Sequence, residues 1–374
     1  MPKHSLVIVG NSTQGLGTIR SAVSLNLPVF VLHDVHFCSS RFSRYSGNYT
    51  KLPKGTIKNL AYSSENIILT ERLLNLPVSF PSPLFGINED INNFFAHNQE
   101  TLRKNYFIPD NDYHLIFDKY EFNKLCPVEN QIPTFLFSDT NLDDLTGQNF
   151  ILKSRRGNKL RNLTGEKAVW MKDFNEKLKE LIKVNFSDGE LIIQQIIISS
   201  KPVTSVCGLS IEGRVAGFFQ YEKLRQHPNQ FGTGTYLKSI YNEELKNITE
   251  IILHKLKYTG IFEVEFIFDD EDKKYKAIEM NPRTWKSIGF ATMCGQNLVE
   301  KYCNYVLGRQ VNYSLEYKTD HYWVDIFTDI PQMFREKKLF GYSKKNLHEC
   351  LWDKKDPLPF LSSFIFAPFY LFKI

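Results

Sequence analysis

Residues 263–285, EVEFIFDDEDKKYKAIEMNPRTW, predict both the fold and the chemistry of this chain of 374 residues. Successive side chains of a β-strand point to opposite faces of the sheet. Residues 262–268 therefore place their Phe and Val side chains on one face, and Glu263 and Glu265 on the other. The first strand of this stretch is predicted to have an apolar face and an acidic face.

The second half of the stretch predicts the returning strand of a hairpin, with its turn at residues 269–274. If this turn centres near Asp272, Glu265 lies opposite Glu279. Alternation places Ala277, Glu279 and Asn281 on one face of the returning strand, and Ile278 and Met280 on the opposite one. Two carboxylates and one amide oxygen are thus predicted to converge on a single face.

Like charges that oppose each other across a hairpin destabilise it unless something neutralises them. A hard divalent cation does so, and Mg²⁺ favours a few carboxylate oxygens together with substrate phosphates. The alternative is a solvated acidic face, and Glu263 and residues 269–272 are assigned to it. For Glu265, Glu279 and Asn281 a metal site is favoured. Arg283 follows them directly, and a face that is merely solvated does not need such a set of residues.

The pattern E-F-x-x-D…I-E-M-N-P-R in this stretch resembles the metal-binding hairpin of the ATP-grasp superfamily of carboxylate–amine ligases. In that family an acidic residue and a later Glu-x-Asn hold Mg²⁺, for which Mn²⁺ is an alternative, on the phosphates of ATP. The resemblance assigns the metal-binding roles to Glu265, Glu279 and Asn281. It places Arg283 against the acyl phosphate or the carboxylate substrate, as a catalytic residue.

Two lysines that precede the hairpin match the upstream lysines of the family. Lys119 lies in F-D-K-Y-E-F at the start of a predicted helix, and Lys153 ends the strand F-I-L-K. A lysine ammonium is a compact point charge that suits phosphate oxygens. Taken alone, each would be an ordinary surface lysine; their order before the Glu/Asn hairpin implies that both bind the nucleotide.

The basic segment 155–159, Arg-Arg-Gly-Asn-Lys, directly follows Lys153 and resembles the flexible loop that covers the phosphates in this family. Arg155 and Gly157 are therefore expected to contact ATP. Closure of such a loop would exclude water from the reaction. The alternative is an ordinary basic turn.

Gln194 and Gln195 resemble the hinge strand whose backbone pairs with adenine in ATP-grasp proteins. The family often has an acidic contact to the ribose shortly after this strand. Residues 199–204 contain no carboxylate, so Thr204 or a residue from elsewhere in the chain is expected to take that place.

Arg225 resembles a basic position that precedes a Gly-containing substrate loop in amino-acid ligases of this superfamily. A guanidinium there can stabilise the phosphoryl group in transfer, which makes Arg225 the second candidate catalytic residue. The alternative is a surface arginine at the end of a hairpin.

The opening glycines support a second hypothesis. Gly10, Gly15 and Gly17 follow a short apolar strand but match neither a P-loop nor a complete dinucleotide fingerprint. Asp34, at the end of the next predicted strand, is placed like an acid that binds a ribose. An NAD(P)-dependent oxidoreductase therefore stays open, although it leaves the Glu/Asn hairpin unexplained.

The predicted fold class is α/β and α+β, with a Rossmann-like pre-ATP-grasp domain followed by a two-subdomain ATP-grasp fold. The opening order of strand, glycine loop, helix and strand indicates a parallel sheet. The expected divisions are a pre-ATP-grasp domain at 1–112, a small lid subdomain at 113–198, a central subdomain at 199–310 and a C-terminal extension at 311–374.

Composition narrows the class of protein. Thirty Phe and eighteen Tyr supply enough apolar surface to exclude intrinsic disorder. A formal charge of +5 over this length is a weak electrostatic case for nucleic acid, and no such partner is expected. Six scattered Cys without a C-x-x-C motif predict reduced thiols in a cytoplasmic protein, and no signal peptide is visible.

The longest apolar run, 358–372, contains Pro359, Pro368 and two serines. It is too short for a membrane span, so no transmembrane segment is expected. A tail docked on the protein is predicted, with peripheral membrane contact as the alternative.

The function predicted from these motifs is an ADP-forming, Mg²⁺-dependent ligase that activates a carboxylate as an acyl phosphate and joins it to an amine or a thiol. The layout is most similar to D-aspartate-ligase-type members of the superfamily, which implies an amino acid as one substrate. A nucleotide-binding protein that does not ligate is a further alternative, and a homodimer is left open.

Overall fold

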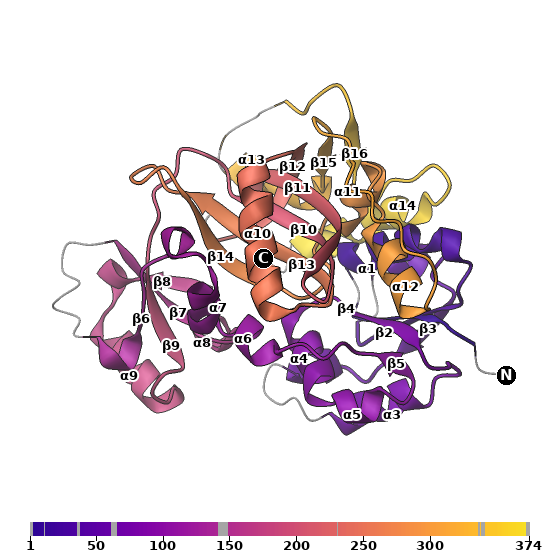
Figure 1. Cartoon of the computed structure of the whole chain (residues 1–374), viewed down its shortest axis with the longest axis horizontal. Coiled ribbons are helices and arrows are strands. Elements are labelled where there is room, and N and C mark those ends of the chain that lie inside the picture. The colour runs from indigo at the N-terminus through magenta and orange to yellow at the C-terminus, as the bar shows by residue number, and fades with distance from the viewer. Residues whose placement is uncertain are drawn as a thin grey trace.

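A computed structural model describes residues 3–10, 12–35, 38–60, 66–140, 149–229, 231–335, 337 and 341–371. Its strands form three sheets, which Figure 1 shows with the small sheet at the left and the N-terminal sheet below the large one. Within the described residues, no helix is both long and apolar enough to cross a membrane.

The N-terminal sheet is parallel, with the strand order β3-β2-β1-β4-β5. Its central strand β1 reads LVIV and is buried throughout, as expected for a parallel strand covered on both faces. Asn and Ser side chains cap three of its helices, with Ser12 before α1, Asn66 before α3 and Asn88 before α4. The elements are β1 (Leu6–Val9), α1 (Thr13–Ser21), β2 (Val29–His33), β3 (Asn48–Lys51), α2 (Thr56–Asn59), α3 (Ile67–Leu74), β4 (Ser82–Gly86), α4 (Glu89–His97), α5 (Gln99–Leu102) and β5 (Tyr106–Phe107).

The small sheet is antiparallel, with the order β6-β9-β7-β8. Phe150, Leu152 and Ile193 pack against Leu160 and Ile182 of its two helices. This sheet has a separate core, so its position depends on the contacts around it. The elements are β6 (Thr134–Leu136), β7 (Phe150–Ser154), α8 (Lys159–Thr164), β8 (Ala168–Trp170), α9 (Glu176–Asn185) and β9 (Leu191–Gln195).

The large sheet has the order β14-β13-β10-β11-β12-β15-β16. Because side chains alternate along its strands, Val206, Phe218 and Phe262 pack under α10, which lies in front of the sheet in Figure 1. Cys207 and Phe219 face the other side, toward α1, α11 and α12. The elements are β10 (Thr204–Ile211), β11 (Arg214–His227), β12 (Thr233–Ile240), α10 (Glu243–Leu256), β13 (Gly260–Phe268), β14 (Tyr275–Asn281), α11 (Ile288–Met293) and α12 (Leu298–Val306).

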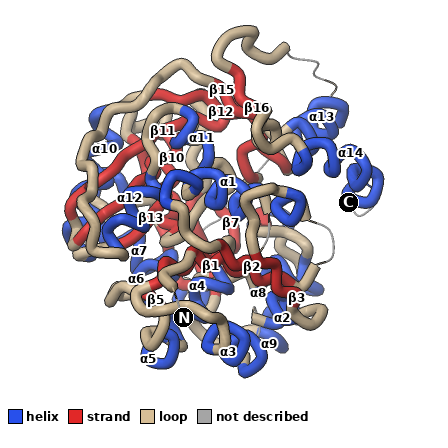
Figure 2. Tube along the Cα trace, turned by 90° about the vertical axis from the view of Figure 1, so that its right-hand side faces the viewer, coloured by secondary structure: helices blue, strands red, loops and turns tan. Residues whose placement is uncertain are grey.

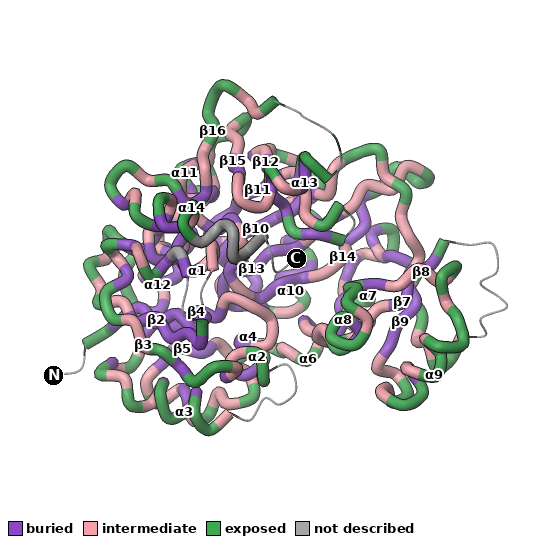
Figure 3. Tube along the Cα trace, turned by 180° about the vertical axis from the view of Figure 1, so that it is seen from behind, coloured by how far each residue is buried: buried purple, intermediate pink, exposed green. Residues whose placement is uncertain are grey.

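Residues 311–374, which the sequence suggests as an extension, add strands to this large sheet. β15 (Tyr322–Val324) pairs antiparallel with β12, and β16 (Leu347–Glu349) pairs parallel with β15. Helices α13 (Ile326–Arg335) and α14 (Leu358–Leu371) follow these strands. Figure 3 shows the strands of the sheet interiors in purple, with exposed segments around them.

Gly17 brings the N-terminal domain into close contact with α11. A Cβ at Gly17 would lie 3.0 Å from the Gly289 nitrogen and 3.0 Å from Cγ2 of Ile288. Beside this contact, Asn297 donates a hydrogen bond of 2.8 Å to the Ser21 carbonyl. The glycine is therefore required for packing between helices, a role that differs from a phosphate contact.

The oxidoreductase hypothesis needs Asp34 free to bind a ribose. In the structure Asp34 is only 9% exposed, and its Oδ2 accepts a hydrogen bond of 3.0 Å from the backbone nitrogen of Ile57. Its Oδ1 lies 3.4 Å from Nδ1 of His33. Asp34 thus holds the start of α2, and this arrangement does not favour a dinucleotide site.

We expect Gly17→Val to destabilise the protein by about 1–3 kcal/mol, because the new side chain overpacks the α1–α11 contact. Gly15→Ala is the matched control, since the nearest atoms to a Cβ there lie at 3.9 Å. It should be neutral or stabilising by up to about 1 kcal/mol, as for Ala replacing Gly in a helix. Urea unfolding measures both values. Equal stability of Gly17→Val and the wild-type protein would contradict the packing role.

Candidate active site

A cavity of about 630 Å³ lies where the three sheets meet. The N-terminal domain contributes Gln14 and Glu89 to its wall, the small sheet contributes Lys153, and the large sheet contributes Glu279 and Arg283. Each of these three parts of the chain presents polar side chains to one shared space, the N-terminal domain from its helices α1 and α4. A molecule bound there would contact all three parts of the chain.

The β13–β14 hairpin has the register that the sequence predicts. Glu265 pairs with Glu279, and Glu263 pairs with Asn281. All four residues line the cavity. The predicted convergence of two carboxylates and an amide on one face is confirmed as geometry.

Glu263 was expected to be solvated, and this expectation is wrong. Its side chain is 4% exposed, accepts a hydrogen bond of 2.5 Å from the Tyr221 hydroxyl and another of 3.3 Å from Nδ2 of Asn281. Burial and the neighbouring Glu265 raise the pKa of Glu263. The alternation that places Glu265 in the cavity places Glu263 there as well, so the sequence carried this signal.

A β-bulge changes which residues of β14 face the cavity. The register shifts between Glu265 and Phe266, so that Phe266 pairs with Ala277. Ala277 therefore joins the apolar cluster under α10, and Ile278 lines the cavity instead. The predicted faces of Ala277 and Ile278 are exchanged, because one extra residue in a strand inverts the alternation beyond it.

Cations surround the two opposed carboxylates. Nζ of the buried Lys223 lies 2.7 Å from Oε1 of Glu265. Burial alone would lower the pKa of Lys223, but the carboxylates of Glu265 and Glu263 outweigh burial and raise it. Burial likewise opposes ionisation of Glu279, yet a set of cations lowers its pKa to about 2. The cations that act on Glu279 are Lys119, Lys167, Lys153 and Arg283.

The donor set at this hairpin fits a hard divalent cation. Glu279 is ionised at neutral pH, and Glu265 is charge-paired. Asn281 lies beside them, with its Nδ2 3.3 Å from Oε1 of Glu279; its Oδ1, the atom that could bind a metal, accepts a hydrogen bond of 2.9 Å from Arg283. Carboxylate and amide oxygens are the ligands that Mg²⁺ and Mn²⁺ accept.

Lysines form the opposite wall of the site. Nζ of Lys153 donates a hydrogen bond of 3.0 Å to Oε1 of Gln194, and burial lowers the pKa of Lys153 to about 8. Lys119 and Lys167 also line the cavity. Within the described part of the chain, neither of them has a carboxylate within ion-pair distance. This wall therefore has positive charge available for an anion. Lys167 belongs to none of the motifs in the sequence, which therefore do not predict its place at the cavity.

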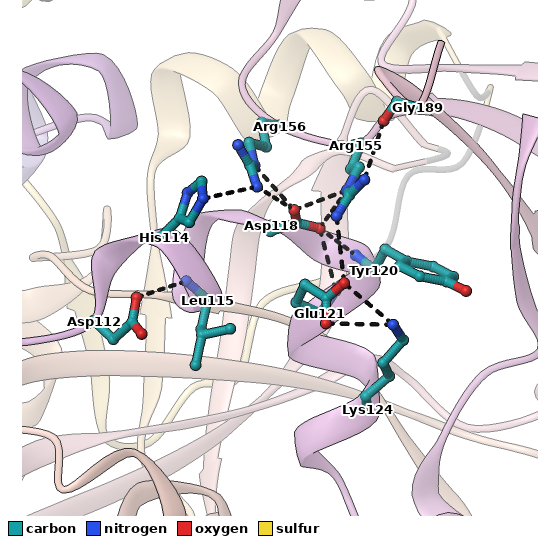
Figure 4. A network of polar contacts seen from close by, with 10 residues as sticks. All are labelled: Asp112, His114, Leu115, Asp118, Tyr120, Glu121, Lys124, Arg155, Arg156 and Gly189. Atoms are coloured by element: carbon teal, nitrogen blue, oxygen red, sulfur yellow. Dashed lines mark hydrogen bonds and ion pairs between the residues drawn. The ribbon is translucent and has the colours of Figure 1, made fainter.

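A buried carboxylate holds Lys119 and the loop after β7 together. Asp118, which is 0% exposed, accepts hydrogen bonds from Nε of Arg155 at 2.8 Å and from Arg156 at 2.7 Å (Figure 4). Its Oδ1 also caps α7 (Lys119–Leu125) through the backbone nitrogens of Tyr120 and Glu121. The backbone nitrogen of Lys119 donates a hydrogen bond of 3.0 Å to the Arg155 carbonyl.

The predicted contact of Arg155 with a nucleotide does not agree with this geometry. The Arg155 guanidinium is bound to Asp118 and Glu121, and it lies outside the cavity wall. Its role is to position the loop. Gly157 does line the cavity, and its backbone nitrogen donates a hydrogen bond of 3.2 Å to Oε1 of Glu89.

Gln194 and Gln195 end strand β9 and line the cavity, as do the two residues that follow them. The Gln194 side chain links Lys153 to the hydroxyl of Thr134, which lies 3.0 Å from its Nε2. Thr204, named as a substitute for a ribose contact, is 2% exposed and is absent from the cavity wall. The structure therefore leaves that contact unassigned.

Arg225 does not reach the cavity either. Its guanidinium lies 2.7 Å from Oδ2 of Asp329 and stacks on the ring of Tyr236. Bulges at residues 223–226 interrupt the pairing of β11 with β12. Lys223 faces the cavity instead, and a pattern of strict alternation does not reveal such bulges.

Buried donors without partners follow the hairpin. Nε of Arg283, Nε1 of Trp285 and Oγ of Ser287 have no hydrogen-bond partner among the described residues, and these three residues line the cavity. Trp285 is 1% exposed and Ser287 is 2% exposed. Arg283 is oriented by a hydrogen bond of 2.9 Å to Oδ1 of Asn281. A buried donor without an acceptor is costly, so this wall fits a ligand that brings acceptors.

Comparison with curated sequences finds one short likeness. The D-aspartate ligase of Enterococcus faecium (strain Aus0004) is 32% identical over 77 residues, which are 20% of this chain and 18% of that ligase. The likeness thus spans less than a fifth of the curated relative. No protein-family model matches the chain.

Solved structures resemble nearly the whole chain. N5-carboxyaminoimidazole synthetase from Staphylococcus aureus matches with a TM-score of 0.66 and 17% identity, over 90% of this chain and 88% of that one. The same enzyme complexed with ADP matches over 90% and 86%, with the same TM-score and identity. L-amino acid ligase from Bacillus licheniformis matches with a TM-score of 0.59 and 16% identity, over 83% and 76%. At these identities the likeness shows the fold, and it confirms the predicted fold class.

Proposed function

Because this chain has the ATP-grasp fold, we propose that it is an ATP-dependent, ADP-forming ligase that joins a carboxylate to an amine. The observation that carries the proposal is the register of Glu265 with Glu279, opposite a wall of lysines in one cavity. Carboxylates for a metal and cations for phosphates are the two elements that phosphoryl transfer requires. The S. aureus structure complexed with ADP supports nucleotide use by this fold.

Glu265, Glu279 and Asn281 would hold Mg²⁺, for which Mn²⁺ is a chemical alternative. When bound, the metal neutralises negative charge on the phosphates of ATP. Lys223 would balance the charge of Glu265. It keeps Glu265 charge-paired while the metal is absent, so the hairpin avoids two unopposed buried charges.

Lys119, Lys153 and Lys167 would bind the phosphates, with adenine beside Gln194 and Gln195. The substrate carboxylate attacks the terminal phosphorus of ATP, the bond from that phosphorus to ADP breaks, and an acyl phosphate forms. The amine then attacks the acyl carbon, loses a proton and expels phosphate. The chain contributes positioning and charge stabilisation to both steps.

The unpartnered donors of Arg283, Trp285 and Ser287 would bind the substrate carboxylate. An ionised carboxylate offers several acceptor positions, and hydrogen bonds to charged groups are the stronger ones. The likeness to a D-aspartate ligase supports an amino acid as one substrate. The six free thiols of the chain support a cytoplasmic location.

Phosphate release from MgATP, measured across a panel of amino acids and amines, tests the reaction. We expect turnover with a matching pair only, and Glu279→Gln should lower it by at least about 100-fold through loss of a metal ligand. Glu271→Gln, an exposed change in the turn of the same hairpin, is the control and should leave turnover unchanged. Wild-type turnover by Glu279→Gln would disprove the metal assignment. ATP binding without turnover for any pair would indicate a non-ligating protein.

ATP affinity should fall as the pH rises above about 8, because Lys153 loses its proton there. Phosphates favour the ammonium form, so binding is strongest below this pKa and weakens by up to about tenfold for each pH unit above it. In Lys153→Arg the guanidinium stays charged, so its affinity should stay flat between pH 7 and 9. Calorimetry of ATP binding measures both profiles. A flat profile of the wild-type protein would contradict the assignment of Lys153.

Trp285→Phe and Ser287→Ala should each raise the KM for the carboxylate substrate by about tenfold or more, while ATP affinity stays unchanged. Ser287→Ala should not destabilise the fold, because it removes a buried donor that has no partner. Trp285→Phe also removes volume from the core, so we expect it to lower the free energy of unfolding by about 1–3 kcal/mol, which urea unfolding measures separately from the KM. Ser210→Ala is the matched control, since its hydroxyl is also buried and unpartnered but lies outside the cavity wall. An unchanged KM in both cavity variants would show that the substrate binds elsewhere.

A further inference from the structure

Helix α14 is strongly apolar, with Ser362 and Ser363 as its polar residues apart from one tyrosine. It spans Leu358–Leu371, reads LPFLSSFIFAPFYL and contains no charged residue. A helix that is apolar all round is normally buried all round. α14 instead lies with α13 at the edge of the molecule, on the side away from α10 (Figure 2). Its apolar surface therefore needs a physical explanation.

Large apolar side chains are exposed in the first part of α14, residues 358–365. Leu358 is 56% exposed, Leu361 50%, Phe364 54% and Ile365 69%. Their spacing of three to four residues places them on one side of the helix. Ser362, in contrast, is 8% exposed and donates its hydroxyl to the Pro359 carbonyl at 3.1 Å. The helix thus turns a serine inward and leucine, phenylalanine and isoleucine outward.

Aromatic contacts hold this face in place and enlarge it. The ring of Phe327, in α13, lies 5.0 Å from that of Phe364, and the ring of Phe360 lies 5.4 Å from that of Trp352. Trp352 is itself 48% exposed. Leu358, Leu361, Phe364, Ile365 and Trp352 together form what we call the apolar patch. Contiguous exposed apolar surface of this kind marks an interaction site.

The charge beside the apolar patch is positive. Lys354, Lys355 and Arg44 are exposed where the chain enters α14, and Arg44 donates to the Lys355 carbonyl at 3.3 Å. The nearby carboxylate of Asp356 is 1% exposed and lies 3.0 Å from Nε of Arg20. Asp353 is half-buried and accepts a hydrogen bond of 2.8 Å from the Lys355 backbone nitrogen. The three exposed cations outnumber this one accessible acid, so the surface beside the patch has a net positive charge.

We propose that the apolar patch docks on an anionic membrane surface, with α14 lying in the boundary between headgroups and acyl chains. An apolar helix face with lysine, arginine and tryptophan at its margin suits that boundary. The fourteen residues of α14 extend about 21 Å, less than the roughly 30 Å of a hydrocarbon core, so the helix lies on the bilayer. A second copy of the chain is the other possible occupant of the patch, and the oligomeric state of the protein distinguishes it from a membrane.

Co-sedimentation of the full chain with lipid vesicles tests this proposal. We expect binding to vesicles of phosphatidylcholine mixed with phosphatidylglycerol, weaker binding to phosphatidylcholine alone, and weakening by salt. Phe364→Asp with Ile365→Asp should abolish binding. Lys354→Glu with Lys355→Glu should remove the preference for anionic vesicles, at about fivefold or more per lysine.

Ile67→Asp is the matched control, because Ile67 is 75% exposed at the start of α3, in another part of the molecule. It should leave vesicle binding unchanged, and thermal unfolding should show all variants folded. Failure of the wild-type protein to bind vesicles, or full binding by Phe364→Asp with Ile365→Asp, would overturn the proposal. Sedimentation equilibrium measures whether the patch instead binds a second copy of the chain. If the wild-type protein is a dimer and Phe364→Asp with Ile365→Asp makes it a monomer, the patch binds a second copy of the chain, and the membrane proposal is overturned.

Discussion

Opposed negative charge in the β13–β14 hairpin is the constraint on which the rest of the site depends. Glu265 and Glu279 pair directly, and the buried Glu263 adds a third carboxyl group beside them. An arrangement of this kind is unstable unless cations lie close to it. The chain supplies Lys223 from β11 within the same sheet and Lys153 from the small sheet. Charge balance thus links the two sheets across the cavity.

The supporting contacts serve that geometry. Asp118 is buried, caps α7 and binds both Arg155 and Arg156, so Lys119 and the loop after β7 hold one position relative to each other. On the opposite side, the absence of a side chain at Gly17 lets α1 approach α11, directly after the unpartnered donors at 283–287. Neither contact could be predicted from the sequence, because each joins residues that are far apart in the chain.

Much of the site could be predicted where local periodicity decides it. The alternation of a regular strand predicted that Glu265, Glu279 and Asn281 share a face, and the register confirms it. Prediction failed where a bulge interrupts that alternation, at Ala277 and Ile278 in β14. Nothing in the sequence indicated that Arg155 pairs with Asp118, because the two residues are 37 positions apart. Lys167 was missed because its place at the cavity depends on how the small sheet folds over the large one.

The sequence by itself determined the hairpin, its acidic face, the parallel N-terminal sheet and the apolar character of 358–371, because period and composition are local properties. Only the tertiary structure decided which cations neutralise the carboxylates, which donors stay unpartnered and that β15 and β16 extend the large sheet. It also decided that Leu358, Leu361, Phe364 and Ile365 of α14 are exposed. These features depend on contacts between residues far apart in the chain, and hydrophobic burial and charge pairing select such contacts only when all the elements pack together.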